Sequence, residues 1–195
     1  MGCLAQGTLQ IRFDSPPQLP GPGQGFFVQQ YFEAGMWFRP LGVVEPGNGF
    51  VRYRGGGQVS SIPDNDTAYL AATFGDSLVF SFANGSAFNL ISVDLAEYST
   101  AFQTPLMVPF TGHLVDGGTV TTSFTTDGII DGDGPLADFE TFYFSPEFSN
   151  LTRVEIQTPG WSLDNLVLKI PEPTPFSLLP VGALLLGILA RRRRN

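Results

Sequence analysis

Short stretches of β-branched and aromatic residues recur along this chain, separated by glycine, proline, asparagine and aspartate, and this pattern most constrains its fold. Helical periodicity is nearly absent from residues 1–170. Such spacing predicts an antiparallel sandwich or barrel. The predicted strands are Thr8–Phe13, Phe26–Phe32, Met36–Arg39, Phe50–Arg54, Ala68–Phe74, Leu78–Phe82, Phe88–Leu95, Met107–Leu114, Thr119–Thr126, Phe139–Phe144, Leu151–Gln157 and Ser162–Ile170.

Alternation within several stretches predicts that each strand buries one face. In Thr119–Thr126, Val120 and Phe124 fall on one side while the intervening hydroxyl residues fall on the other. Val154 and Ile156 alternate with charged and polar neighbours in the same way. One-sided strands are typical of antiparallel sheets with a single buried face. We therefore expect an all-β fold, an antiparallel β-sandwich with jelly-roll topology.

Charge and residue counts exclude several classes of function. Four of the ten basic residues are consecutive, Arg191 to Arg194, so residues 1–190 carry the other six against all 18 acidic residues, a formal charge of −12. A body of that sign repels phosphate backbones, which argues against nucleic-acid binding. The single cysteine, Cys3, excludes an internal disulfide and a cysteine-built zinc site.

The sequence also argues against an enzyme. His113 is the only histidine, and no Gly-x-Ser-x-Gly nucleophile motif occurs. Asp94 and Glu97 form a carboxylate pair of the kind that glycoside hydrolysis uses, but nothing in the pattern indicates a cleft that would aim both at one bond. We therefore predict a non-enzymatic protein.

The last 25 residues, 171–195, have three parts that differ from the body. Pro171-Glu172-Pro173 opens the segment, an uncharged apolar stretch follows from Phe176 through Leu185 to Ala190, and Arg191, Arg192, Arg193 and Arg194 close it. As a helix, 176–190 would span roughly 22 Å, less than the ~30 Å hydrocarbon core of a bilayer. Snorkelling arginines and local thinning can close that gap. The arginines favour the cytoplasmic side, which places residues 1–170 across the membrane; the alternative is a buried core helix that ends in arginine.

This tail resembles the PEP-CTERM sorting signal of Gram-negative bacteria. The resemblance implies export, anchoring in the inner membrane, and processing by an exosortase, a membrane-embedded cysteine transpeptidase. It also implies a final location at the cell surface or in the extracellular matrix. The predicted organisation is a leader remnant at 1–7, without a recognisable signal peptide, then a β-sandwich domain at 8–170 and the sorting signal at 171–195.

The body is similar, more weakly, to galactose-binding-like or carbohydrate-binding-module-like jelly rolls. The similarity rests on Phe88–Glu97, the strand that contains Val120, Phe139–Phe142 and Gly160–Leu166. Such domains often end in a strand that carries Leu-Asp-Asn, as Leu163 to Asn165 does here, and some hold a structural calcium ion near it.

The resemblance implies that the first and last strands pair. Asp14 ends the first predicted strand and Asp164 begins the last, so their carboxylates would converge, with Glu33 nearby. Carboxylate and carbonyl oxygens suit Ca²⁺. The alternative is that these are solvated carboxylates at strand edges.

Two tryptophans are the candidate sugar-binding residues. Trp37 and Trp161 could each stack on a sugar ring, as could Tyr53 and Tyr69, although aromatic residues of a sandwich often belong to its core. The predicted function is that of an exported, non-enzymatic structural or adhesive protein of the cell surface or extracellular matrix, as in a biofilm. The alternative is a carbohydrate-binding module that recognises exopolysaccharide.

Overall fold

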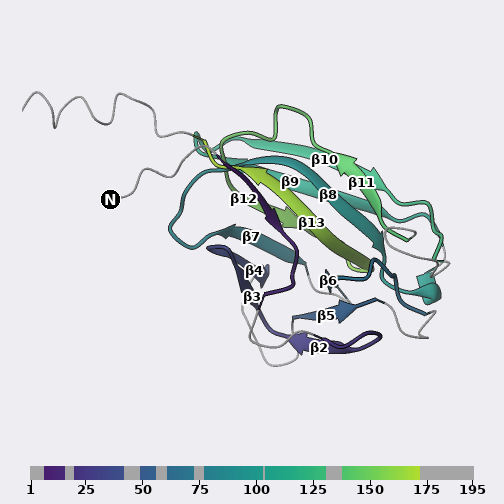
Figure 1. The fold of residues 1–195 in the computed structure, drawn as a ribbon. Helices are drawn as coiled ribbons and strands as arrows, with labels where there is room; N and C mark the ends of the chain where they lie inside the picture. The colour runs from purple at the N-terminus through teal and green to yellow at the C-terminus, as the bar shows by residue number, and fades with distance from the viewer. Residues whose placement is uncertain are drawn as a thin grey trace, which may run out of the picture.

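The computed structural model describes residues 7–15, 20–41, 49–55, 61–72, 77–102, 104–130 and 138–171, and these residues form strands with a single short 3₁₀ turn (Figure 1). The strands are β1 (Thr8–Ile11), β2 (Gly25–Val28), β3 (Tyr31–Glu33), β4 (Met36–Pro40), β5 (Phe50–Arg54), β6 (Ala68–Ala71), β7 (Leu78–Phe82), β8 (Asn89–Glu97), β9 (Met107–Leu114), β10 (Thr119–Thr125), β11 (Glu140–Tyr143), β12 (Leu151–Ile156) and β13 (Trp161–Lys169), and the 3₁₀ turn is η1 (Thr100–Phe102).

One predicted strand is wrong. Phe26–Phe32 is two strands, β2 and β3, and the chain changes sheets between them: β2 pairs with β5, whereas β3 pairs with β4. The switch falls at Gln29 and Gln30, two polar residues inside an otherwise apolar run. A run of apolar residues does not by itself show where a chain crosses from one sheet to the other.

The strands form two antiparallel sheets. Sheet A has the order β11-β8-β13-β6-β5-β2, with β1 also paired to β13, and sheet B has the order β10-β9-β12-β7-β4-β3. The last eight strands read β6-β13-β8-β11 in sheet A and β7-β12-β9-β10 in sheet B. Among these eight strands, neighbours in the chain therefore hold equivalent positions in the two sheets, and the chain crosses between sheets at every connection except the β9–β10 hairpin. This is a jelly roll, so the predicted fold class is confirmed for the described residues.

Phenylalanine fills the space between the sheets. Phe13 and Phe38 meet edge to face at 5.0 Å, Phe38 stacks on Phe80 at 5.5 Å, and Phe80 reaches Phe88 at 6.2 Å. All four side chains are fully buried. Tilted and offset contacts of this kind each add about 0.5–1.5 kcal/mol beyond the burial of area. The high phenylalanine content of the sequence is thus largely a property of the core.

Sheet A also carries a small second cluster on its outer face. Tyr69, Ala71, Ala96 and Phe139 are buried there, and Tyr53 and Tyr98 pack against them. This cluster explains why all of β6 is buried although it forms a sheet with two faces. Sheet B differs, because its strands keep half-buried or exposed side chains on their outer face.

The first and last strands lie side by side. Thr8 pairs with Lys169 and Ile11 with Leu166, in antiparallel register. Residues 8 and 169 therefore leave the sandwich at the same end (Figure 1). Residues 1–6 of the predicted leader (1–7), the sorting motif (171–173) beyond Pro171 and the predicted helix at 176–190 lie outside the described residues. No helix within the described ranges is long and apolar enough to span a bilayer.

Candidate functional site

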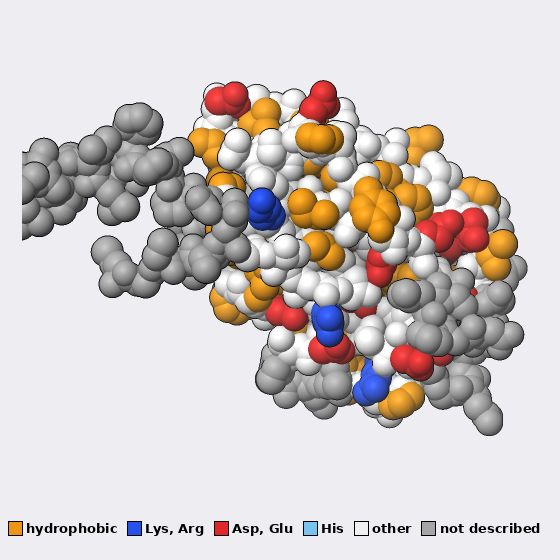
Figure 2. Space-filling view, turned by 45° about the horizontal axis from the view of Figure 1, so that its top comes forward, with side chains coloured by type: hydrophobic (Ala, Val, Ile, Leu, Met, Phe, Trp, Pro, Cys, Tyr) orange, Lys and Arg blue, Asp and Glu red, His pale blue; other side chains and the backbone are white. Residues whose placement is uncertain are grey.

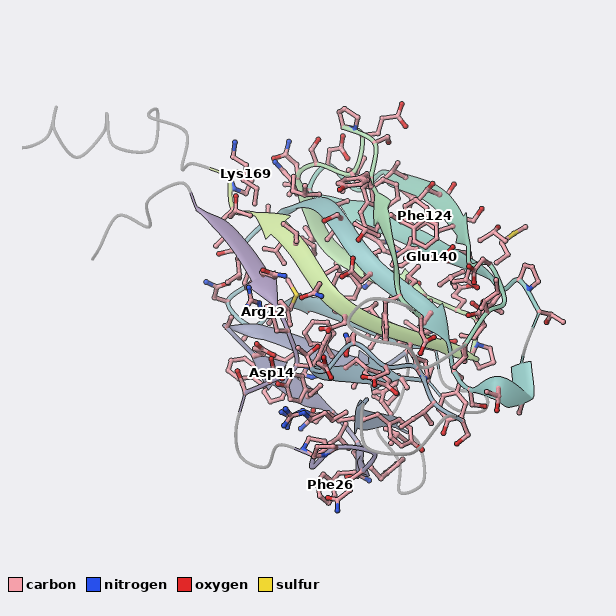
Figure 3. All side chains as sticks on the ribbon, turned by 45° about the vertical axis from the view of Figure 1, so that its right-hand side comes forward. Arg12, Asp14, Phe26, Phe124, Glu140 and Lys169 are labelled. Carbon is pink, nitrogen blue, oxygen red and sulfur yellow. The ribbon has the colours of Figure 1, made fainter. Side chains whose placement is uncertain are left out.

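The three predicted metal ligands lie on different elements, because Glu33 is on β3 of sheet B whereas Asp14 and Asp164 belong to the β1 and β13 region of sheet A. Asp14 follows β1 closely (Figure 3), and its Oδ1 accepts a hydrogen bond from the backbone N of Ala68 at 3.1 Å. Glu33 turns to β1 and to its own strand instead: it accepts from the backbone N of Arg12 at 3.4 Å and from the Tyr31 hydroxyl at 2.8 Å. Each of these carboxylates is thus satisfied by donors of the chain itself.

Asp164 is fully buried on the outer side of sheet A, within a set of polar side chains. Its Oδ2 accepts hydrogen bonds from Asn65 Nδ2 at 2.6 Å and from Thr67 Oγ1 at 2.8 Å. Its Oδ1 accepts from the backbone N of Asn165 at 2.6 Å. The side chain of Asn165 continues the network, because its Nδ2 donates to Asp94 Oδ2 at 2.8 Å.

Burial dominates the ionisation of Asp164. Desolvation raises the pKa of Asp164 from 3.8 to about 8, and the neighbouring carboxylate of Asp14 adds to the rise. The three hydrogen bonds from Asn165, Thr67 and Asn65 act in the opposite direction but do not offset the burial. Near neutral pH, Asp164 therefore holds its proton in a large fraction of molecules.

A group of three or more acidic, histidine or cysteine side chains close enough to hold a metal ion does not occur among the described residues. The calcium site at Asp14, Glu33 and Asp164 stays a prediction.

The structure separates the two candidate tryptophans. Trp161 is fully buried, where it stacks on Phe50 at 6.4 Å and donates from Nε1 to the carbonyl of Thr158 at 2.6 Å. A ring enclosed in the core offers no face to a sugar, which corrects the prediction for Trp161. Tyr69 is likewise fully buried, with Phe139 against its edge at 5.2 Å.

Trp37 lies on the outer face of sheet B in a different setting. It is half-buried on β4, and its ring centroid lies 4.6 Å from that of Phe32, the residue opposite it on β3. Phe32 is 45% exposed. The guanidinium carbon of Arg39, two residues further along β4, lies 4.3 Å from the centre of the Trp37 ring. Two aromatic rings and a cation thus form a ledge on this face, which we call the Trp37 ledge (Phe32, Trp37 and Arg39).

Polar side chains continue the ledge across sheet B. Trp37 pairs with Ser81, and Arg39 lies in a cross-strand row with Val79, Glu155 and Thr111. The row connects the aromatic end of the face to a charged group on β12 and β9.

That charged group centres on Glu155. Its Oε1 lies 3.2 Å from Arg153 Nε and 2.9 Å from His113 Nε2, the latter at an angle that does not make a hydrogen bond. Glu155 is nearly buried, whereas Arg153 is about half exposed. The ledge and this group together provide ring faces, hydroxyls and cations on one surface.

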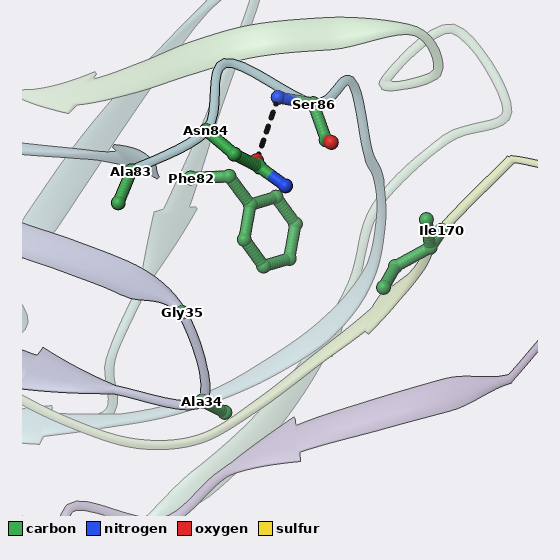
Figure 4. A pocket seen from close by; sticks show the side chains of 7 residues that line it. All are labelled: Ala34, Gly35, Phe82, Ala83, Asn84, Ser86 and Ile170. Atoms are coloured by element: carbon green, nitrogen blue, oxygen red, sulfur yellow. Dashed lines mark hydrogen bonds between the residues drawn. The ribbon is translucent and has the colours of Figure 1, made fainter. Parts of the chain in front are cut away.

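Two hollows lie elsewhere, at the end of the sandwich from which β13 leaves. One has a volume of about 240 Å³ and is lined by Ala34, Gly35, Phe82, Ala83, Asn84, Ser86 and Ile170 (Figure 4). A larger, more open one of about 690 Å³ is lined by Ala87, Leu114, Val115, Asp116, Glu147, Ser149 and Asn150.

Sequence reasoning selected Trp37 but missed its partners. The alternation of β4 places Trp37 and Arg39 on one face, a signal available in the sequence. The contact with Phe32 was hidden because β3 was predicted as part of a longer strand. The proximity of Glu155 depends on the order β4-β7-β12, which no local pattern contains.

No family model matches the chain, and no curated protein matches it. Among solved structures it is similar to a family 29 carbohydrate-binding module, with a TM-score of 0.38 and 10% identity over 90% of this chain and 95% of the other. It is also similar to the family 11 carbohydrate-binding module of Clostridium thermocellum in complex with a β-1,3-1,4-mixed-linked tetrasaccharide, with a TM-score of 0.34 and 10% identity over 86% of this chain and 98% of the other. Likenesses at this level carry no argument about a ligand.

Proposed function

We propose that the outer face of sheet B binds carbohydrate, with the Trp37 ring as its platform. The observation that carries the proposal is the Trp37 ledge itself, an aromatic pair on the outer face of a sheet with Phe32 45% exposed and Trp37 half-buried, although most large aromatics among the described residues are buried. The C–H face of a sugar ring packs on an aromatic surface, while its hydroxyls need polar partners beside that surface. Ser81, in register with Trp37, and Thr111 further across the sheet supply such groups.

The Trp37 ring is carried by a strand that has a paired neighbour on both sides and is therefore held in a fixed position. β4 lies between β3 and β7 in sheet B, so Trp37 has a paired neighbour on each side. The inward neighbours of Trp37 on β4, Met36 and Phe38, are fully buried in the core. A platform held in this way loses little conformational freedom when a ligand binds.

Affinity electrophoresis of the full chain against a panel of polysaccharides tests the proposal. The variant Trp37→Ala should lose retention of whichever polymer the wild type binds, by about tenfold or more in affinity, because the platform is gone. Val115→Ala is the matched control, since it removes an exposed apolar side chain from a turn away from the ledge. Equal retention of wild type and Trp37→Ala would contradict the proposal.

We also propose that residues 171–195 sort the protein to the cell surface through an exosortase, so that the binding face acts there. The support for this second proposal is the order of parts in the tail: the Pro-Glu-Pro motif, the apolar segment at 176–190 and the terminal arginines. The two proposals are independent, because the face lies on the body and the signal lies on the tail.

A further inference from the structure

From the distribution of charge we infer that the ligand of the sheet B face is an acidic polysaccharide, whose sugar rings carry carboxylate groups. This inference rests on the proposed function, because it names the class of glycan that the Trp37 ledge binds. Two arginines on the face, Arg39 and Arg153, recognise the carboxylates, while Trp37 packs against the ring.

The face is an exception within an acidic body. Residues 1–190 carry six basic against 18 acidic side chains, and Figure 2 shows acidic side chains at several places on one view of the surface, with lysine and arginine fewer and scattered. On the strands of sheet B, the face of Trp37 carries Arg39, Arg153 and His113 but a single acidic residue, Glu155. Two of the six basic residues of the body therefore lie on this one surface.

Both arginines keep donors available for a ligand. Arg39 is exposed and lies over the Trp37 ring, and no carboxylate in the described part of the chain contacts it. Arg153 directs its Nε to Glu155, but its side chain is 52% exposed. A guanidinium presents five N–H donors in a planar fork that matches a carboxylate. Each arginine can therefore hold a carboxylate through its terminal nitrogens.

The spacing suits a polymer rather than a single acid. The cross-strand row of Arg39 crosses β7 and meets β12 at Glu155, and Arg153 lies two residues from Glu155 along β12. Two strand spacings of ~4.8 Å and a shift of two residues at ~3.4 Å each place the two arginine Cα atoms about 12 Å apart. Trp37 lies beside Arg39, at one end of this span. A chain that crosses the strands would thus place one ring on Trp37 and its charged groups near the two arginines.

A matched pair of polymers tests the inference. Polygalacturonate and the same polymer with its carboxyl groups reduced to alcohols differ in charge but keep the same backbone. We expect the full chain to bind polygalacturonate at least tenfold more tightly at 0.15 M salt, where a Debye length of about 8 Å screens the remote acidic surface but not contacts within the face. Arg39→Gln and Arg153→Gln should each weaken binding to polygalacturonate by about tenfold.

The control variant is Lys169→Gln, which makes the same change in net charge on sheet A, away from the face. It should leave binding unchanged; a loss equal to that of Arg153→Gln would indicate nonspecific attraction and would overturn the inference. Arg153→Gln should weaken binding of polygalacturonate more than binding of the reduced polymer, because only polygalacturonate offers carboxylates to the guanidinium.

The outcomes distinguish the acidic character of the ligand from the binding of carbohydrate by the sheet B face. Equal affinity for both polymers, with loss of both in Trp37→Ala, would overturn the acidic ligand and leave the carbohydrate-binding face standing. If Trp37→Ala does not change the affinity for either polymer, the proposal that this face binds carbohydrate is contradicted. Thermal melting of each variant verifies that the fold is retained.

Discussion

Asp164 is the residue whose chemistry departs most from that of an ordinary aspartate. It combines full burial with three donors and a neighbouring carboxylate. Because its pKa is about 8 in the folded protein against 3.8 as the ordinary value, the folded state binds a proton that the unfolded chain releases between these two pH values. Stability contributed by this group is therefore present below about pH 4 and is lost as pH rises towards 8.

Urea unfolding at about pH 5 and about pH 8 should reveal this dependence. We expect the wild type to lose stability over that interval relative to Asp164→Asn, which cannot titrate. The difference should amount to a few kcal/mol at most, since each pKa unit corresponds to about 1.4 kcal/mol. Asp116→Asn, in the exposed β9–β10 turn, is the control and should keep the wild-type dependence. Parallel curves for wild type and Asp164→Asn would show that burial does not hold the proton.

At the scale of elements, the conformation and packing of the segment after β10 require a glycine at position 128. Gly128 has a φ of +81°, and a Cβ there would lie 2.7 Å from the backbone N of Pro105. Its own backbone N donates to Glu97 Oε1 at 2.7 Å, and Thr126 also donates to that oxygen. The segment is thus held against β8 and the loop that precedes β9 by contacts that leave no room for a side chain.

Gly128→Ala should therefore destabilise the protein by more than the cost of the backbone conformation alone. Gly117 provides the comparison, because it has a similar φ of +91° in the β9–β10 turn, but a Cβ added to it would meet nothing within 4 Å. We expect about 1 kcal/mol for Gly117→Ala from backbone strain and at least twice that for Gly128→Ala from strain and overpacking together. Chemical denaturation of the two variants measures both, and equal losses would exclude a packing contribution.

The strands also show which features of the fold can be predicted from the sequence. The alternation of β10 and β12 and the turn residues between strands identified most of the strands, because one-sided burial imposes a period of two that is visible locally. The split between β2 and β3 was missed because both strands are apolar, and the partner of an apolar strand is a tertiary property. For the same reason, the sequence does not show that Trp161 is buried while Trp37 is partly exposed. Both tryptophans lie on strands, and only the packing of the two sheets determines which ring is covered.

At the scale of the whole molecule, the sorting proposal concerns the fate of the tail. Expressed with a signal peptide in a host that has an exosortase, the protein should lose its C-terminal segment and appear beyond the inner membrane. A variant that lacks residues 171–195 should be released as a soluble periplasmic domain, and mass spectrometry of the mature protein measures the new end. An intact tail in mature surface material would replace sorting with permanent anchoring.

The pairing of β1 with β13 determines how the body responds to mechanical load. Antiparallel hydrogen bonds run perpendicular to the strands, and β13 is bonded to β8 on one side and to β1 and β6 on the other. Tension that enters through Pro171 and is resisted at the sheet B face pulls β13 along its own length, so both of its ladders are sheared at once and share the force. Tension between the two ends of the chain instead pulls Thr8 away from Lys169 and opens the bonds one pair at a time. The same strand pair is thus strong in one direction of pulling and weak in the other.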